Sequence, residues 1–436
     1  MFKLSITHKL FSVLFLILAL SLAASAQSYD RIERSRMSSI LDVVKDTVKK
    51  NYYDQTYRGI DLEARFKKAE ERLGQVNSTP AALAVIAQVL VDFNDSHLFF
   101  IPPSTDLAVE YGWRMRAMGN DVFVTAVKPG SDAEKKGVKV GDLILSVGGF
   151  RPTKNELWKV QYFYNGISKR DRLALKLLSP GSEAPRDVEV MSEMKRTPRN
   201  ITAQSFFRLF DDFYEPENDK HRFYTFEGVS LWKMPGFDFE DGQVDQLMDR
   251  VKNSRSLIID MRGNGGGYIK TLERLSGFFV EKDTKIADLK GRKNMDPIAA
   301  KTRGKDVYGG RVVVLIDSAS GSAAEMFARM IQLEKRGKVV GDVSAGAVMQ
   351  SRAFDEQVGV SGVVLFGVSV TNADVIMTDG KSLEHVGVQP DEIVIPTGDD
   401  LANQRDPALA KAVELLGGNL SPQAAGKLNV YYWKKT

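Results

Sequence analysis

The chain has 436 residues, 43% of them hydrophobic and 27% charged, which is enough for two or three domains with a substantial core. Its net charge of +4 is too small to argue for binding to nucleic acid. The sequence contains no cysteine, which excludes disulfides, a cysteine–zinc site, a lipid-anchored cysteine and a thiol nucleophile. Because it contains only four histidines, a histidine-rich metal cluster is not expected, and we predict neither a metal nor an organic cofactor.

Residues 1–26 have the pattern of a secretory signal. A short basic flank precedes an apolar stretch at 10–24, and the small residues Ala24 and Ala26 stand where a signal peptidase reads. The apolar stretch is shorter than the ~20 residues that a membrane helix needs. We therefore predict a cleaved signal, a periplasmic or extracellular protein and no stable membrane span after cleavage. An uncleaved N-terminal anchor is the alternative.

Residues 27–105 are predicted to be mostly helical, because apolar residues recur there at helical spacing. Pro80 is typical of the first turn of a helix. His97 lies between the last helix and a short apolar strand. An imidazole in this place could act as a general base, although a lone histidine at an element boundary is more often structural. The expected elements are helices at 40–52, 61–73 and 81–93 and a strand at 98–101.

Residues 106–195 combine short apolar strands with glycine-rich turns. The stretch 127–142 carries Pro-Gly, Gly and Gly-Asp in an order that resembles the signature of a PDZ domain. That resemblance implies a groove that captures a peptide C-terminus as an added strand and holds its carboxylate with backbone N–H groups. Tyr111, Gly112 and Trp113 occupy the place of the carboxylate-binding loop. A PDZ fold that only regulates or spaces is the alternative.

Residues 196–396 are predicted to form an α/β unit, followed by a tail, 397–436, with one helix at 407–416 and then polar loop. A buried strand at 256–260 runs into three adjacent glycines, 265–267. Glycines at a strand-to-helix turn let the backbone approach a ligand closely and leave N–H groups pointing outward. A phosphate-binding loop is excluded, because the Gly-Lys-Ser/Thr ending and the GxGxxG pattern are both missing.

The apolar, β-branched run at 312–316 predicts a strand buried on both faces. Small residues follow, and helical spacing of apolar residues begins at Ala323. A hydroxyl at the start of such a helix lies beside free N–H groups and the positive end of the helix dipole, which is the setting that a nucleophilic serine needs. We favour Ser322 as the nucleophile, with Ser320 as the second choice. Taken alone, the stretch fits a turn with N-capping serines better.

Four motifs follow one another in order: Asp-Ser-His at 95–97, the PDZ-like segment, the glycine run at 260–267, and Ser-Gly-Ser-Ala-Ala-Glu at 320–325 before a closing strand. Together they resemble the C-terminal processing, or tail-specific, serine protease family. The resemblance implies an α/β fold: a mixed-sheet protease core of crotonase-like ββα units, an inserted PDZ β-sandwich and an N-terminal helical region. In that family the nucleophile lies three residues before a glutamate, which here is Glu325, so the resemblance also indicates Ser322.

The sequence departs from the better-known branch of that family, which uses a Ser–Lys dyad. Ala347 stands 25 residues after Ser322, where the lysine is expected. The chain looks more like the tricorn-core branch, in which a Ser-His pair before the PDZ domain and a later glutamate complete a tetrad. The matching residues are Ser96, His97 and Glu384. By this resemblance, His97 takes the proton of Ser322, and Ser96 and Glu384 fix the hydrogen bonds around the catalytic groups.

The same resemblance implies an oxyanion hole made of backbone N–H groups, from Gly266 or Gly267 and from Ala323. His385, beside the predicted glutamate, is expected to be a solvated bystander. His221 lies in a charged segment and is expected at the surface.

The leading hypothesis is an exported serine endopeptidase whose partners are polypeptides, recognised through their C-termini by the PDZ domain. A catalytically inactive peptide- or ligand-binding protein on the same scaffold is the alternative, since loss of the dyad lysine is also what an inactive enzyme would show. A hydrolase of other acyl substrates is a third, weaker idea. No nucleic-acid partner is predicted, and the oligomeric state stays open.

Overall fold

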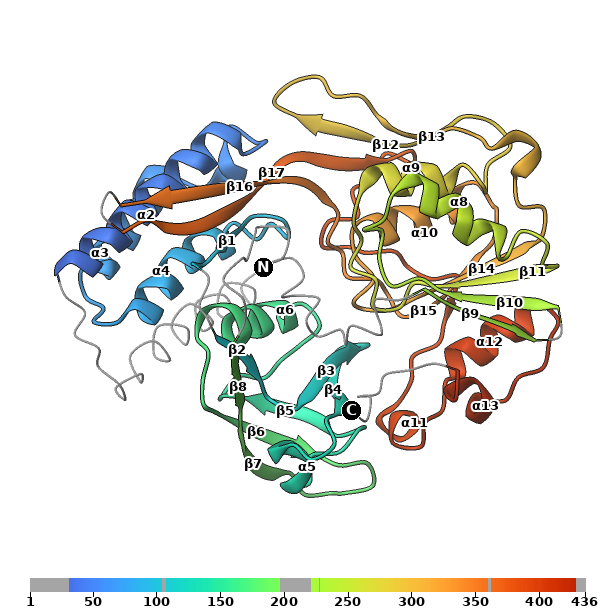
Figure 1. The fold of residues 1–436 in the computed structure, drawn as a ribbon, viewed down its shortest axis with the longest axis horizontal. Coiled ribbons are helices and arrows are strands. Elements are labelled where there is room, and N and C mark those ends of the chain that lie inside the picture. Colours follow the sequence, from blue (N-terminus) through green and yellow to red (C-terminus); the bar gives the residue numbers. More distant parts are fainter. Residues whose placement is uncertain (1–30, 104–106, 197–220, 227, 360–361, 429–436) are drawn as a thin grey trace, which may run out of the picture.

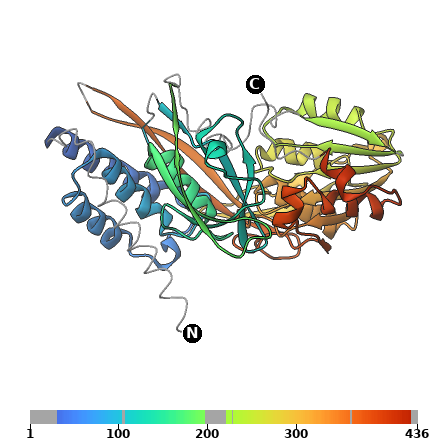
Figure 2. The ribbon, with the colours of Figure 1, turned by 90° about the horizontal axis from the view of Figure 1, so that it is seen from below.

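The computed structural model describes residues 31–103, 107–196, 221–226, 228–359 and 362–428. The predicted signal segment lies outside these residues. Three parts follow one another along the longest axis of the molecule in Figure 2: an N-terminal group of helices, a β domain in the middle, and a larger α/β core. Within the described residues, no helix is both long enough and apolar enough to cross a membrane.

The N-terminal part consists of three helices around an apolar centre (Figure 1). The last of them, α4, is almost entirely apolar and buried on all sides, and Pro80 lies in its first turn. The predicted helices are therefore present, and the first begins earlier than expected. The elements are α2 (Arg31–Asn51), η1 (Tyr57–Gly59), α3 (Leu62–Leu73) and α4 (Thr79–Val91).

The N-terminal part shares a sheet with the core. Strand β1 (Phe99–Ile101) pairs antiparallel with β17 (Val364–Met377), a long strand whose other partners are β16 (Met349–Val358) and β12 (Thr284–Gly291). Strand β13 (Ile298–Ala300) completes this sheet. Because β1 begins two residues after His97, this pairing fixes the histidine against the core. The sequence did not predict β16, whose polar, half-exposed residues carry no clear apolar pattern.

The middle part is an insertion between β1 and the core. Its entering strand β2 (Leu107–Glu110) pairs antiparallel with its leaving strand β8 (Glu193–Arg196), so the chain enters and leaves at one place. Between them lies a five-stranded antiparallel sheet with β3 at one edge, and α6 continues directly into η2. The elements are β3 (Trp113–Met118), β4 (Asp121–Val127), α5 (Asp132–Lys135), β5 (Leu143–Val147), α6 (Leu157–Gln161), η2 (Tyr162–Ile167), β6 (Arg172–Leu178) and β7 (Arg186–Met191).

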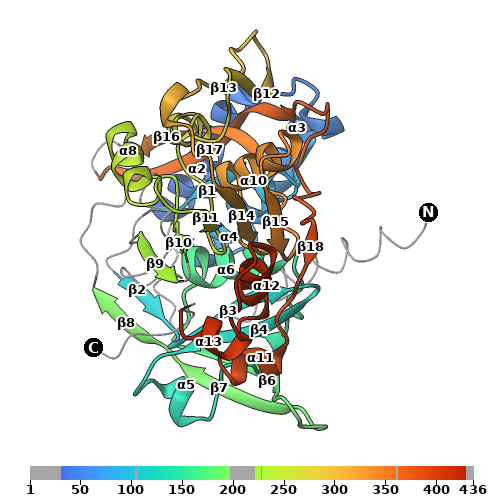
Figure 3. The same ribbon diagram turned by 90° about the vertical axis from the view of Figure 1, so that its right-hand side faces the viewer.

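The core is built on a six-stranded sheet in the order β18-β15-β14-β11-β10-β9, parallel except at β9. Successive residues of β14 face opposite sides: Val312 and Val314 pack under α8, α9 and α10, whereas Val313 and Leu315 pack on α12 (Figure 3). The elements are β9 (Arg222–Phe226), β10 (Val229–Lys233), α8 (Asp241–Asp249), β11 (Ser256–Asp260), α9 (Ile269–Ser276), η3 (Gly304–Asp306), β14 (Arg311–Ile316), α10 (Ala323–Leu333), β15 (Lys338–Gly341), β18 (Glu392–Ile393) and α12 (Pro407–Leu415).

The prediction of a single helix in the tail was wrong. Two short helices, α11 (Gly398–Ala402) and α13 (Pro422–Gly426), flank α12 in the described part of the tail. Each has five residues, too few to show an apolar period, but each begins at a hydroxyl N-cap, Thr397 and Ser421, that accepts a backbone hydrogen bond.

Candidate active site

The predicted nucleophile and the glycine run lie together because their strands are neighbours. Strands β11 and β14 pair in parallel, with Asp260 opposite Leu315, so the turns that follow them leave the same edge of the sheet. The Gly321 N–H donates to the Asn264 carbonyl at 2.9 Å and ties one turn to the other. The carboxyl edge of a parallel sheet is where α/β proteins build their sites.

Ser322 is the N-cap of α10, and its backbone is strained. Its φ of 52° lies in a region that non-glycine residues rarely adopt. Its N–H donates to the Ala347 carbonyl at 3.0 Å and to the Glu325 carboxylate at 3.0 Å. Strain of this kind persists where the surrounding contacts fix it, and it gathers at functional sites.

Glu325 fixes the turn around Ser322 through hydrogen bonds to its carboxylate. This fully buried carboxylate accepts from Ser344 Oγ at 2.6 Å, Gly346 N–H at 2.8 Å and Ala347 N–H at 2.9 Å, as well as from Ser322. Burial raises its pKa to about 7, against these donors, which favour the ionised form. The family resemblance indicates Glu325 only as a landmark for Ser322 and gives it no role of its own. A glutamate in the first turn of an apolar helix was the available signal that it caps the turn.

The glycine run packs directly on the nucleophile. A Cβ on Gly266 would lie 2.6 Å from the Ser322 Cβ, so only glycine fits there. The Gly266 N–H donates to Asn264 Oδ1 at 2.9 Å, and the Asn264 amide in turn donates to the Met234 carbonyl. Among the described residues, no acceptor meets the N–H of Gly267 or of Ala323. Of the three predicted oxyanion donors, these two keep a free N–H.

The structure brings Ser96, His97 and Glu384 into one hydrogen-bonded chain. Ser96 Oγ lies 2.8 Å from His97 Nδ1 and donates to Glu384 Oε2 at 2.8 Å. The Ser96 N–H donates to Glu384 Oε1 at 2.9 Å, and the Val348 N–H donates to Glu384 Oε2 at 3.0 Å. These residues come from the segment between α4 and β1, from the segment after β17, and from the loop before β16.

The Ser322 turn and the hydrogen-bonded chain of Ser96, His97 and Glu384 are linked through one short segment, residues 347–348. Ala347 accepts from the Ser322 N–H, and the next residue, Val348, donates to Glu384. In the described part of the chain, no hydrogen bond joins the His97 and Ser322 side chains themselves. Apo active sites often hold such pairs at longer range than the reacting complex does.

His97 is partly exposed, and the protein around its ring shifts the pKa of the imidazole. Burial lowers the pKa of His97 below its ordinary value of 6.5, and the nearby charges of Glu384 and Asp95 oppose that shift. The ring is therefore neutral near pH 7, the form in which an imidazole can accept a proton.

Two histidines differ from expectation. His385 is not only a solvated bystander, because its Nε2 lies 2.7 Å from the Asn94 carbonyl and 3.4 Å from Glu384 Oε1. His221 was expected at the surface, but its ring packs edge-on against Phe239 and its Nδ1 accepts from the Trp232 indole at 3.1 Å. The charged neighbours in the sequence hid this aromatic contact, which depends on residues farther along the chain.

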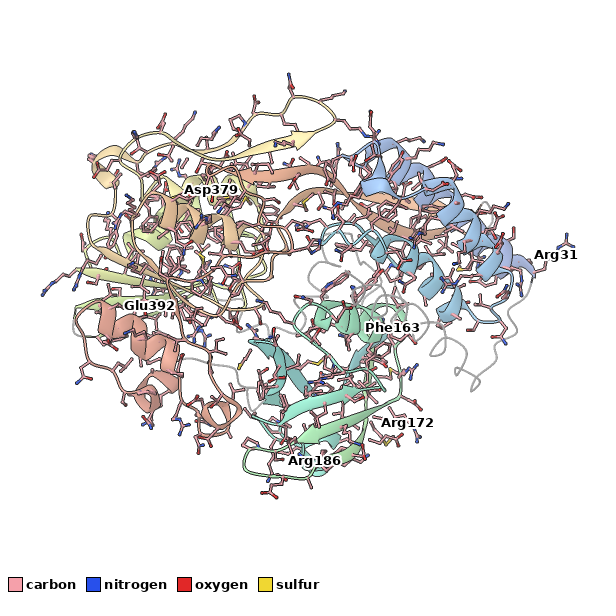
Figure 4. The ribbon with its side chains drawn as sticks, turned by 180° about the vertical axis from the view of Figure 1, so that it is seen from behind. Arg31, Phe163, Arg172, Arg186, Asp379 and Glu392 are labelled. Carbon is pink, nitrogen blue, oxygen red and sulfur yellow. The ribbon has the colours of Figure 1, made fainter. Side chains whose placement is uncertain are left out.

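The predicted peptide-binding residues lie in the inserted β domain, apart from Ser322. Tyr111 and Trp113 line a cavity between β3 and the α6–η2 segment, together with Met115 and Tyr164. A Cβ on Gly112 would lie 2.5 Å from the Ser131 Cβ, so this loop is tightly packed. In Figure 4, Phe163 and Arg172 mark this domain and Asp379 and Glu392 mark the core.

The inserted domain is docked on the core at the turn before Ser322. Arg116 of β3 forms an ion pair with Asp317, and Ser318 Oγ donates to the Ala117 carbonyl. Lys154 Nζ donates to the Val343 carbonyl at 2.6 Å, in the loop that leads to Ala347. The edge strand of the inserted sheet thus lies against the loops that shape the site.

Comparison with known proteins finds similarities to peptidases over part of this chain. Residues 229–394 match the profile of peptidase family S41. Curated relatives include the tail-specific protease of Haemophilus influenzae, 22% identical over 67% of this chain and 43% of that protein. Another is the chloroplastic C-terminal processing peptidase of Tetradesmus obliquus, 22% identical over 79% of this chain and 74% of that protein. The chain spans about half the length of the first curated relatives that it matches.

Solved structures show the same fold. Mature CPAF superposes with a TM-score of 0.64 at 14% identity, covering 85% of this chain and 94% of that one. The photosystem II D1 C-terminal processing protease superposes with a TM-score of 0.50 at 19% identity, covering 89% and 99%. The chain therefore has a mixed α/β fold like that of S41 proteases, with homologues among the C-terminal processing and tail-specific proteases, and the comparisons support a serine peptidase.

Proposed function

We propose that this chain is an exported serine endopeptidase that cleaves polypeptides through an acyl-enzyme on Ser322, with His97 as the base. The observation that carries the proposal is the hydrogen-bonded chain Glu384–Ser96–His97, joined through residues 347–348 to the strained turn of Ser322. A serine hydroxyl is a weak nucleophile without such a base.

The hydrogen bonds favour one tautomer of His97. Glu384 accepts from two backbone N–H groups and from Ser96 Oγ, which is the pattern of an ionised carboxylate. If the Ser96 hydroxyl donates to Glu384, its oxygen accepts from His97 Nδ1–H. The lone pair is then on Nε2, which takes the proton of Ser322 and returns it to the leaving amine. The Glu384 charge, relayed by Ser96, stabilises the imidazolium.

The oxyanion of the tetrahedral intermediate would be met by the N–H groups of Gly267 and Ala323. Both lack an acceptor among the described residues, and Ala323 opens α10, where the helix dipole adds positive potential. Gly266 would act differently, because its N–H is bound to Asn264 and its missing side chain makes room for Ser322.

We assign the inserted domain to PDZ-type recognition of peptide C-termini, with Tyr111, Gly112 and Trp113 at the carboxylate-binding loop. Support comes from the edge position of β3 and from the cavity between β3 and α6. A domain that only regulates or spaces is the competing assignment. A peptide-array screen with free and amidated C-termini separates the two, since only C-terminal recognition requires the free carboxylate.

The test is cleavage of an unfolded protein by the exported form. Ser322→Ala and His97→Ala are expected to lose at least ~10³-fold in rate, because each removes one member of a nucleophile–base pair. Ser318→Ala is the matched control: it removes a hydroxyl from the same turn, and the hydrogen bond that it loses is to the Ala117 carbonyl of the inserted domain, not to Ser322 or His97. If both site variants cleave as fast as the parent, the assignment fails.

A further inference from the structure

Asp95 is a buried carboxylate that accepts a hydrogen bond from the backbone of His97. It is 2% exposed, and its Oδ1 accepts from the His97 N–H at 3.0 Å and from Thr371 Oγ1 at 2.6 Å. Its Oδ2 accepts from the Tyr52 hydroxyl at 2.8 Å and lies 3.8 Å from Arg58 Nη2. Burying a charged carboxylate is costly unless several donors satisfy it, and here four groups do.

Those donors come from three separate elements. Tyr52 directly follows α2, Arg58 lies in η1 and Thr371 lies in the middle of β17. Tyr52 and Thr371 are fully buried, so they leave the carboxylate little freedom to turn. A second contact completes the anchor: Ser369 Oγ, also on β17, donates to the His97 carbonyl at 2.7 Å. The peptide units on both sides of the histidine are thus fixed by groups far away in the sequence.

We propose that Asp95 is a positioning residue for His97: it holds the main chain of the base against β17 and keeps a negative charge beside the ring. This rests on the proposed function only in naming His97 as the base. Because Asp95 is itself buried and its described contacts are Tyr52, Arg58, Thr371 and the His97 backbone, it acts through His97 and not on substrate.

The charges around the ring come from each element packed against it. Asp95 precedes it in the chain, and Glu384 reaches it from the segment after β17 with His385 beside that carboxylate. The Arg58 guanidinium lies 3.8 Å from the Asp95 carboxylate and partly offsets its charge. Removal of the Asp95 charge therefore leaves Glu384 as the remaining anion that favours the imidazolium, so the pKa of His97 falls.

The test uses the exported chain labelled with ¹³C at histidine Cε1. Only four histidines occur in the whole sequence, so the His97 ring can be followed by NMR titration after assignment with a His97→Asn sample. Asp95→Asn keeps the shape of the side chain and removes its charge. We expect a lower pKa of His97, an acid limb of kcat/KM moved to lower pH, and a kcat reduced on the order of 10- to 100-fold with little change in KM.

Two further variants keep the proposal testable if Asp95→Asn folds poorly. Thr371→Val removes a donor to the same Oδ1 but keeps the charge, so it should lower kcat several-fold without lowering the pKa of His97. Asp142→Asn changes an equally buried, ion-paired aspartate in the inserted domain and should leave the pKa of His97 where it is. Circular dichroism checks the folding of each variant.

The proposal is overturned if folded Asp95→Asn has the parent's His97 titration and the parent's kcat, or if Thr371→Val leaves kcat unchanged. A reduced rate with an unmoved acid limb would indicate a structural role alone and would also overturn it. The NMR titration does not need peptidase activity. If Ser322 proves unreactive but Asp95→Asn still lowers the pKa of His97, the proposed function fails while the anchoring of His97 stands.

Discussion

The guanidinium of Arg116, on the edge strand of the inserted domain, forms an ion pair with Asp317, the residue that follows β14 in the core. The same carboxylate accepts from the Gly263 N–H at 2.8 Å, the Ala319 N–H at 3.1 Å and Ser320 Oγ at 3.2 Å. One buried aspartate thus ties the inserted domain to the glycine turn and to the turn that carries Ser322. The inserted domain is part of the scaffold of the site, not an appended module.

Arg116→Ala is expected to loosen both turns, because it removes the guanidinium that pairs with the buried Asp317 carboxylate. Breaking a buried pair of this kind costs about 3 kcal/mol of stability, and we expect the rate of cleavage to fall together with Tm. Thermal unfolding and an activity assay measure the two effects. Arg172→Ala is the control, since its ion pairs are exposed and contribute less than about 1 kcal/mol. Equal behaviour of the two variants would contradict the scaffold role.

Gly266→Ala is expected to abolish activity. The added Cβ would lie 2.6 Å from the Ser322 Cβ, closer than atoms can pack, and the φ of 106° already disfavours any side chain. Gly181→Ala is matched to it, because Gly181 also has a positive φ, 75°, but a Cβ there meets nothing within 4 Å. It should lose only about 1 kcal/mol of stability and keep its activity. A fully active Gly266→Ala would show that the glycine turn does not bear on the nucleophile.

Ser96→Ala and Glu384→Gln are expected to lower kcat more than they raise KM. Ser96→Ala removes the hydroxyl that joins the imidazole to the carboxylate. Glu384→Gln replaces a carboxylate that accepts from three donors with a neutral amide, in which one of the two oxygens becomes an NH2 donor. We expect losses of roughly 10²- to 10⁴-fold in kcat, by analogy with other Ser–His systems that lose their orienting group. Steady-state kinetics of the folded variants measure these losses in kcat and any change in KM. His385→Ala is the comparison, and a loss as large as that of Glu384→Gln would make His385 the partner instead.

The stability of the chain should fall in mild acid because of His221. Burial lowers the pKa of His221 to about 4, from an ordinary value of 6.5, and the charge of Arg250 adds to this shift. The unfolded chain then binds a proton that the folded chain does not, so this stability is present above pH 6.5 and is lost as pH falls toward 4. Protonation would also take away the acceptor for the Trp232 indole.

His221→Phe keeps the ring packing and cannot titrate. We expect its Tm to vary less than that of the parent between pH 7 and pH 4.5, as measured by differential scanning calorimetry. His385→Phe, at an exposed ring, controls for the loss of any histidine. A parent and a His221→Phe variant with the same pH profile would contradict the assignment of this pH dependence to His221.

Much of the site could be predicted because its signals are local. The strand at 312–316 and the helix that begins at Ala323 follow from apolar patterning, and they place Ser322 at the turn where the structure has it. Ser96 and Glu384 were singled out by their order in a family motif, and the structure brings them into hydrogen-bonding distance. The catalytic roles of these residues stay predictions.

What could not be predicted depends on distant contacts. Asp95 stood in the motif, but its role as an anchor needs Tyr52 and Thr371, which lie 43 and 276 residues away. His221 looked like a surface residue because its aromatic partners lie farther along the chain. Strand β16 was missed because its residues alternate weakly, and its pairing with β17 alone makes it a strand.

The central claim is that Ser322 is a nucleophile activated by His97. It is tested most directly by reaction with a fluorophosphonate, followed by intact mass and peptide mapping. The account predicts one phosphonyl group per chain, on Ser322, with labelling that is lost in Ser322→Ala and slowed at least ~10²-fold in His97→Ala. An unlabelled parent, a label on Ser320, or a His97→Ala variant that labels at the parent's rate would contradict it.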